Sequence, residues 1–367
     1  MEDSLRPKTK RPRLAPVLKA LAAALLFGIN APLSKALLAP GGLGEVAPIP
    51  MAAFLYLGSG LGAWALLRVR RQEATAVSEA TLQRGDVPWL VGALLAGGVA
   101  APIVLMFGLR VTPGATASLL LNFEGVATTL IAALAFREAV GQRVWGAIGL
   151  ITAASIVLSW EPGGRLGVSL GALGILAACV LWGVDNNLTR SISARNPLTI
   201  VAAKGLGAGL FSLVLALLVG QPLPRLGAAL IAMALGSVSY GLSIMLFILA
   251  LRDLGAARTS ALFSSAPFVG ALLSFAILGE GVRTQFLVAL PLMLAGTVLL
   301  VTEQHGHEHR HGFLAHEHRH RHDDAHHDHA HTPGEIPPNG WHSHPHEHAP
   351  QVHEHPHAPD LHHRHQH

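Results

Sequence analysis

Ten long apolar stretches constrain the fold of this chain more than any other feature. A helix that crosses a membrane needs about 20 mostly apolar residues, and only 13% of the 367 residues are charged. Ordinary soluble domains carry roughly 25%. The stretches are residues 16–38, 46–67, 88–109, 113–136, 141–160, 169–190, 197–219, 226–250, 254–278 and 284–302. They predict an all-α membrane protein with ten transmembrane helices, surrounded by lipid.

The basic residues indicate how these helices are oriented. Cytoplasmic loops are enriched in Lys and Arg, and the N-terminal segment 1–15 is strongly basic. With this segment in the cytoplasm, the loops on the far side receive few basic residues, namely Arg110, Arg165, Arg225 and Arg283. We therefore expect both termini in the cytoplasm, and the body in a bacterial inner (plasma) membrane.

The two halves of the apolar region resemble each other. Residues 26–35 align with 181–190, which pairs Gly28 with Gly183 and Asn30 with Asp185. A second register pairs Leu109 with Leu251 and Glu138 with Glu280, without a gap. Each half, 16–160 and 169–302, contains five predicted helices. Because five is odd, the two repeats are expected to have opposite topology, as in many secondary transporters.

These paired residues resemble the EamA-type members of the drug/metabolite transporter superfamily. The motif residues are Gly28 and Gly183 after an aromatic residue, Pro267, and Glu138 and Glu280 at helix ends. The first-repeat counterpart of Pro267 is Gly125, a departure from the family pattern. The resemblance implies a carrier that works by alternating access without ATP. It does not imply a substrate.

Glu124 is a carboxylate near the middle of a predicted span of Leu, Ala, Val and Thr. A charge at that depth costs about 2.5–3.5 kcal/mol, so such residues usually face the protein interior and mark solute or proton pathways. Burial disfavours the charged form of a carboxylate, so Glu124 could bind a proton or a cation. The alternative is a structural pairing with Lys204.

Four further polar residues complete the predicted transport pathway. Asp185 and its counterpart Asn30 are expected at the interface between the repeats, beside Asn186. The alternative role for the first two is hydrogen bonding between helices. Lys204 either extends to the cytoplasmic surface or pairs with Glu124 or Asp185. Glu138 and Glu280 are expected to cap helices or contact loops.

The last segment, 303–367, differs from the body in composition. It holds all 23 histidines of the chain and few apolar residues, so we predict a disordered cytoplasmic tail. Imidazole binds Ni²⁺, Co²⁺ and Zn²⁺. The candidate metal ligands recur in His-x-His pattern: His305, His307, His309, His311, His316, His318, His320, His322, His342, His344, His346, His348, His353, His355 and His357. The alternative is a low-complexity tail that binds metal only incidentally.

Together these features predict a secondary transporter that exports a small solute, with proton coupling through Glu124. One alternative is a divalent metal efflux carrier for nickel, cobalt or zinc. Another is a membrane-bound metal sensor, although an anchor needs only one helix. No nucleophile–base motif indicates an enzyme, and the basic residues follow the membrane topology rather than a nucleic-acid surface. No cofactor is required by this prediction, and metal is expected only at the tail.

Overall fold

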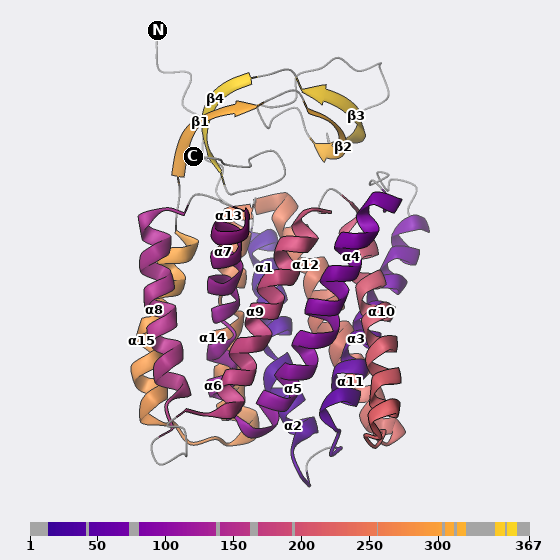
Figure 1. The fold of residues 1–367 in the computed structure, drawn as a ribbon, viewed down its shortest axis with the longest axis vertical. Helices are drawn as coiled ribbons and strands as arrows, with labels where there is room; N and C mark the ends of the chain where they lie inside the picture. Colours follow the sequence, from indigo (N-terminus) through magenta and orange to yellow (C-terminus); the bar gives the residue numbers. More distant parts are fainter. Residues whose placement is uncertain are drawn as a thin grey trace.

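Ten apolar spans run side by side in the computed structural model of the chain, and α1 begins at the end of the bundle where α15 finishes (Figure 1). The structure describes residues 14–41, 44–72, 81–136, 140–161, 168–192, 195–254 and 256–302. It also describes the tail segments 305–311, 314–320, 342–348 and 351–357. All ten spans coincide with the predicted stretches to within a few residues. The prediction of an all-α membrane protein is therefore confirmed.

Five spans come from residues 14–159. Their elements are α1 (Leu14–Gly28), α2 (Asn30–Leu38), α3 (Pro48–Gln72), η1 (Arg84–Asp86), α4 (Val87–Ala93), η2 (Leu94–Ala100), α5 (Ala101–Val111), α6 (Gly114–Leu120), α7 (Phe123–Phe136) and α8 (Gln142–Ser159). The other five come from residues 170–301. Their elements are α9 (Leu170–Arg190), α10 (Pro197–Val219), α11 (Leu226–Gly236), η3 (Ser237–Leu242), α12 (Ser243–Leu254), α13 (Ala256–Phe263), α14 (Ala266–Leu278) and α15 (Thr284–Val301).

Local sequence explains where several helices begin and end. Asn196 caps α10 by accepting a hydrogen bond from the Thr199 amide at 3.1 Å, and Pro197 occupies the first turn. Proline fits there because the backbone N–H groups of the first turn have no hydrogen-bond partner within the helix, so the N–H that proline lacks is not needed. Gly220, with φ of 74°, ends the same helix, since glycine adopts the left-handed conformation at little cost.

Two kinds of interruption recur at matched positions in the two halves. The third spans both contain a π-helical segment, η2 in the first half and η3 in the second. The fourth spans both break into two helices, α6 and α7 at 121–122 and α13 and α14 at 264–265. In the register that pairs Leu109 with Leu251, each interruption aligns with its counterpart. π-Segments occur frequently at functional sites.

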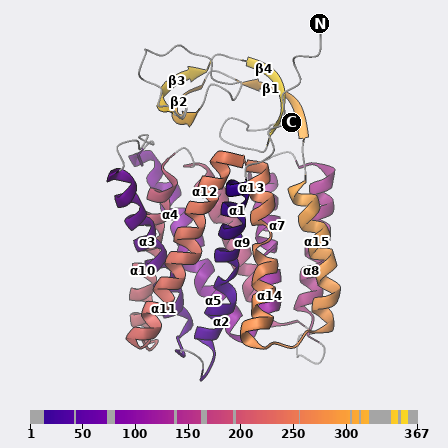
Figure 2. The same ribbon diagram turned by 180° about the vertical axis from the view of Figure 1, so that it is seen from behind.

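The core of the bundle lies between the halves. The most extensive helix contacts all join one half to the other, with α3 against α10, α8 against α15, and α5 and α7 against α9. The contacts of α9 with α5 and α7 have counterparts in the contacts of α1 with α12 and α14. Figure 2 shows these helices from behind. The two halves therefore share one core.

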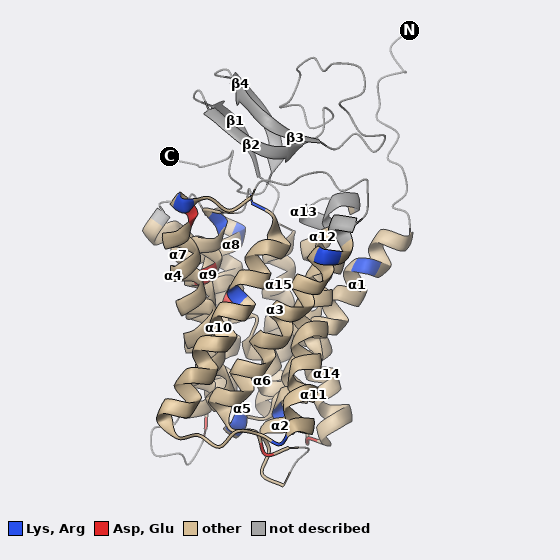
Figure 3. Ribbon diagram, turned by 90° about the vertical axis from the view of Figure 1, so that its right-hand side faces the viewer, with Lys and Arg blue, Asp and Glu red and all other residues tan. Residues whose placement is uncertain are grey.

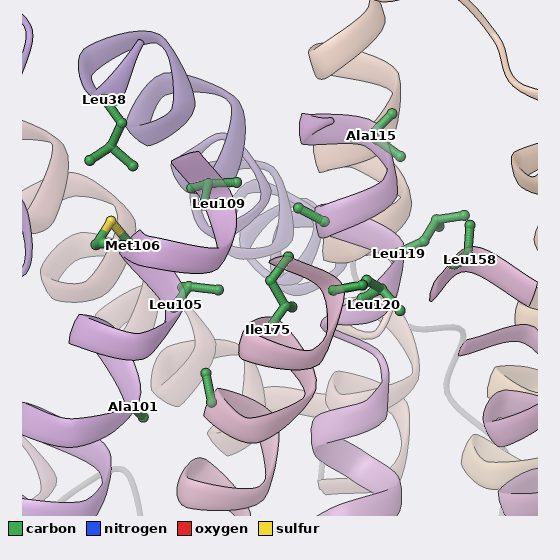
Figure 4. Packing of buried hydrophobic residues seen from close by; sticks show 14 of the residues in the cluster. Leu38, Ala101, Leu105, Met106, Leu109, Ala115, Leu119, Leu120, Leu158 and Ile175 are labelled. Atoms are coloured by element: carbon green, nitrogen blue, oxygen red, sulfur yellow. The ribbon is translucent and has the colours of Figure 1, made fainter. Parts of the chain in front are cut away.

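Apolar side chains fill this core and also cover the outside. Leu105 and Leu109 of α5, Ile175 of α9, and Leu119 and Leu120 of α6 are buried in one cluster (Figure 4). Large apolar residues such as those of α10 point outward and stay exposed, as expected for a surface solvated by lipid. Charged residues gather mainly towards the two ends of the bundle (Figure 3).

Glycines allow α3 and α10 to approach closely. A Cβ atom on Gly60 would lie 2.5 Å from the Leu206 backbone nitrogen, and one on Gly205 would lie 2.5 Å from that of Gly60. On Gly209 it would lie 2.6 Å from the Leu57 nitrogen. Small residues permit such backbone contact between membrane helices. These glycines of α3 and α10 thus form packing surfaces between the two helices.

Four segments of the tail lie in two pairs of short strands. Strand β1 (His305–His311) pairs antiparallel with β4 (Gln351–His357), and β2 (Leu314–His320) pairs with β3 (His342–His348). Alternating sequences suit the two-residue period of a strand, which explains why these four segments are extended rather than irregular. Apart from His322, the candidate ligands lie on these strands, but their side chains are outside the described residues, as is the whole of His322.

Candidate functional site

Glu124 lies directly after the break between α6 and α7. It occupies the first turn of α7 and is only partly buried. Its Oε1 atom accepts a hydrogen bond from the Asn186 side-chain amide of α9 at 2.9 Å, and the same amide donates to Thr128 Oγ1 at 3.1 Å. A carboxylate at this position also lies at the positive end of the dipole of α7. Glu124 therefore links the two halves, with Asn186 as its direct partner.

Asn186 is exposed, although it does not face lipid. The exposed apolar residues Leu170, Leu173 and Val180 mark the outer face of α9. At 100° per residue, Asn186 lies about 120–160° around the helix from each of them, and its bonds to α7 point inward. An exposed amide on the inner face of a membrane helix indicates space within the bundle that a solute or water can reach.

Lys204 of α10 pairs with Asp185 rather than with Glu124. Its Nζ atom lies 2.5 Å from Asp185 Oδ1, which also accepts a hydrogen bond from Thr189 at 2.8 Å. The side chains are 16% and 9% exposed. Of the alternatives for Lys204, the structure thus has the pairing with Asp185. Both charges remain within electrostatic range of Glu124.

Gly97, in the π-segment η2, holds three of these elements together. Its carbonyl oxygen accepts hydrogen bonds from the Tyr56 hydroxyl of α3 at 2.7 Å and from the Trp182 indole of α9 at 3.0 Å. A Cβ atom on Gly97 would lie 1.9 Å from Asp185 Oδ2. Only glycine therefore fits here without moving the carboxylate.

Asn30 occupies the equivalent place in the first half. It donates to Ser239 Oγ at 3.2 Å and accepts from Ser34 at 2.7 Å. Ser239 lies in η3 and aligns with Gly97 of η2. Asn30 and Asp185 share no hydrogen bond among those described, but each contacts the π-segment of the opposite half. The predicted polar residues at the repeat interface thus occupy equivalent positions.

A set of aromatic residues beside this cluster was not predicted from the sequence. The rings of Tyr56 and Tyr240 lie 5.8 Å apart, and Phe27 lies 5.7 Å from Tyr240. Both tyrosines lie within electrostatic range of Glu124. The chain contains only two tyrosines, and one falls in each half inside a predicted span. That rarity is the signal that could have identified them.

The glycines and the proline of the family motif serve packing and helix breaks. A Cβ atom on Gly28 would lie 2.5 Å from the Ala266 carbonyl oxygen, and one on Gly183 would lie 2.9 Å from Thr128 N. Each first span therefore packs closely on the fourth span of the other half. Pro267 lies in the first turn of α14, directly after the break.

Glu280 bonds across the halves at the end of the bundle opposite the start of α1. Its carboxylate accepts hydrogen bonds from the Gly114 and Ala115 amides at 2.6 and 2.9 Å. It therefore caps α6, in agreement with one of its expected roles. Lys35 donates at the same end to the Leu109 and Arg110 carbonyls at 2.9 and 3.0 Å. Glu138 lies outside the described residues.

The described residues were also compared with the requirements of a transition-metal site. No group of three or more His, Cys, Asp or Glu side chains is close enough to hold a metal within the described part of the chain. Cys179, the one cysteine, is buried. The site instead combines a carboxylate, amides, an ion pair and aromatic rings.

Comparison with known proteins agrees with this architecture. Residues 169–302 match the EamA-like transporter family. The matched residues comprise α9 to α15. An uncharacterized transporter of Methanothermobacter thermautotrophicus is 28% identical over 303 residues, which cover 78% of this chain and 86% of that protein. A crystal structure of a protein superimposes with a TM-score of 0.55 at 19% identity, over 77% of this chain and 94% of the other, which supports the fold alone.

Proposed function

We propose that this chain is a secondary transporter of the drug/metabolite type that exports a small organic solute by alternating access. The observation that carries the proposal is the exposed Asn186 amide on the inner face of α9, bonded to Glu124 of the opposite half. A solute that reaches this amide touches both repeats at once. Relative movement of the repeats could then expose the site to one side of the membrane or the other.

The matched features of the two halves support an inverted repeat. The π-segments, the breaks in the fourth spans, and the contacts of Asn30 and Asp185 all recur in equivalent places. The match of residues 169–302 to the EamA-like transporter family, and the name of the Methanothermobacter relative, support the same function. We place both termini in the cytoplasm of a bacterial cell, on the basis of the Lys and Arg distribution.

Proton coupling is assigned to Glu124. A group that alternately binds a proton and a solute couples the two fluxes when both compete for it. In proteoliposomes that contain the purified full chain, an imposed pH gradient should drive solute movement in the direction opposite to proton flow. Glu124→Gln should stop this movement. If the unaltered chain moved the solute at the same rate with and without the pH gradient, the coupling would be rejected.

Survival of cells with and without the gene tests the substrate. The panel should contain Ni²⁺, Co²⁺, Zn²⁺ and organic toxicants. Protection against an organic compound is expected, and its loss in Glu124→Gln would tie it to this site. Protection against none of the panel compounds, together with no solute flux in proteoliposomes, would contradict the proposed function.

The His-rich tail motivates divalent metal efflux as a second candidate. The body has no histidine, so tail ligands could only supply metal to the pathway or report on its concentration. If metal is the cargo, deletion of residues 305–367 should weaken resistance mainly at low metal, because a tethered ligand raises the local concentration. Metal resistance unchanged by the deletion and by Glu124→Gln would reject this candidate and leave metal binding confined to the tail.

A further inference from the structure

The carboxylate of Glu124 lacks a cationic partner within the described residues. Its Oε1 atom is bonded to Asn186, and no described hydrogen bond or ion pair engages Oε2. The one lysine nearby, Lys204, is already paired with Asp185 at 2.5 Å. Because that pair is neutral as a whole, it does not compensate the negative charge of an ionised Glu124.

Four aromatic rings in contact with one another form a wall contributed by both halves, and its two tyrosines lie within electrostatic range of Glu124. Tyr240 contacts Tyr56 and Phe27, and Phe27 contacts Phe263 at 5.2 Å. All four residues are partly exposed, although their rings contact each other between helices. The face of an aromatic ring carries negative potential and attracts cations, above all quaternary ammonium groups.

One ring of this wall is held in place before any solute arrives. The Tyr56 hydroxyl is bonded to the Gly97 carbonyl at 2.7 Å, so its ring, rather than its hydroxyl, remains available to a ligand. The neighbouring Trp182 indole is anchored on the same carbonyl at 3.0 Å. Preorganised groups bind more tightly because less freedom is lost on binding.

We propose that this site binds a monovalent organic cation, with its ammonium group beside Glu124 and its apolar part against Tyr56, Tyr240 and Phe27. The proposal rests on the proposed function and names its substrate class. An anion would meet the negative charge of Glu124. A zwitterion would need a free cation for its own carboxylate, and Lys204 is committed to Asp185. A transition metal would need more ligands than the described residues provide.

Three ligands of similar size separate these classes. Phenyltrimethylammonium carries the positive charge, tert-butylbenzene is its neutral isostere, and benzenesulfonate carries the opposite charge. Binding to the purified full chain in nanodiscs would be measured by equilibrium dialysis. We expect saturable binding of the cation, at least tenfold weaker binding of the neutral isostere, and no saturable binding of the anion.

Variants assign the binding to these residues. Glu124→Gln should weaken binding of the cation at least tenfold, whereas Glu124→Asp should retain most of it. Tyr240→Leu should weaken it severalfold, and Tyr240→Phe should not, because only the ring is needed. Glu161→Gln changes an exposed carboxylate outside the site and should leave binding unchanged. Thermal unfolding of each variant identifies any that fail to fold.

Two results would overturn the proposal. The first is absence of saturable cation binding, or benzenesulfonate binding as tight as that of the cation. The second is cation binding that survives both Glu124→Gln and Tyr240→Leu in folded protein. If proteoliposomes nevertheless move neutral or anionic solutes, the proposed function stands without the cation site. If the cation binds but no solute crosses the membrane, binding stands and transport fails.

Discussion

Lys204 forms its ion pair with Asp185, and Glu124 instead accepts a hydrogen bond from Asn186. This division of partners decides the electrostatics of the site. Had Lys204 paired with Glu124, the central carboxylate would have been neutralised by the protein. As it is, the ion pair is internal to the second half, and Glu124 of the first half remains available for a proton or a cationic solute.

Glu124→Gln is expected to abolish transport while the protein still folds. Glutamine keeps the size of the side chain and can still bond to Asn186, but it binds neither a proton nor a cation. Solute flux in proteoliposomes measures the effect, with Glu161→Gln as the matched control that should keep full activity. Flux close to the unaltered level in Glu124→Gln would make the residue structural.

Removal of either partner of the Asp185–Lys204 pair is expected to destabilise the fold. A buried charge left unpaired costs about 3–5 kcal/mol, so Asp185→Asn and Lys204→Met should each lower the free energy of unfolding by roughly this amount. The double variant should lose less than the sum, because it leaves no unpaired charge. Unfolding in mixed micelles measures all three variants, and strict additivity would show that the pair contributes little.

Gly97→Ala should disturb the site by one added methyl group. Its Cβ atom would lie 1.9 Å from Asp185 Oδ2, so the carboxylate must move away from Lys204. Overpacking of this kind costs about 1–3 kcal/mol. Gly149→Ala in α8 is the matched control, because its Cβ atom would meet nothing within 4 Å and alanine favours a helix by about 0.5–1 kcal/mol. Equal melting temperatures for the two variants would contradict the close contact.

Glu280→Gln tests the cap on α6. The carboxylate accepts two backbone hydrogen bonds, whereas an amide side chain has one acceptor oxygen and no charge. Bonds to a charged group contribute about 1.5–3 kcal/mol each, and we expect a loss of about 2 kcal/mol in the free energy of unfolding. Cation binding at Glu124 should be unaffected, because the two sites share no contact. An unchanged stability would argue that solvent replaces the cap.

Cysteine accessibility tests the topology. Glu161 and Arg84 are exposed. Glu161 follows the fifth span and Arg84 begins the third span, and the proposed orientation places them on opposite sides of the membrane. Glu161→Cys should react with an impermeant thiol reagent in intact cells, and Arg84→Cys only after permeabilisation. The native Cys179 is buried and should stay silent. Labelling of both variants from the same side would reject the inverted topology.

The sequence by itself determined the ten spans, since length and apolarity dictate which segments cross a membrane. It also singled out Glu124, because a carboxylate in the middle of a span is costly unless it faces the protein interior. The paired residues also indicated the matched halves. Partner choice was not accessible in this way. Lys204 had two candidate carboxylates, and only the packing of both α9 and α10 against η2 placed it beside Asp185.

The role of Gly97 and the meeting of Tyr56 with Tyr240 were likewise decided only by the tertiary structure. These residues lie in different spans, and in the tyrosine pair also in different halves, so no local pattern relates them. A π-segment shifts the register of a helix by one residue. The carbonyl of Gly97 and the residues that follow it therefore point in directions that a regular helical period does not predict. Composition and periodicity specify the faces of single helices, whereas a site made by several helices depends on how those faces pack.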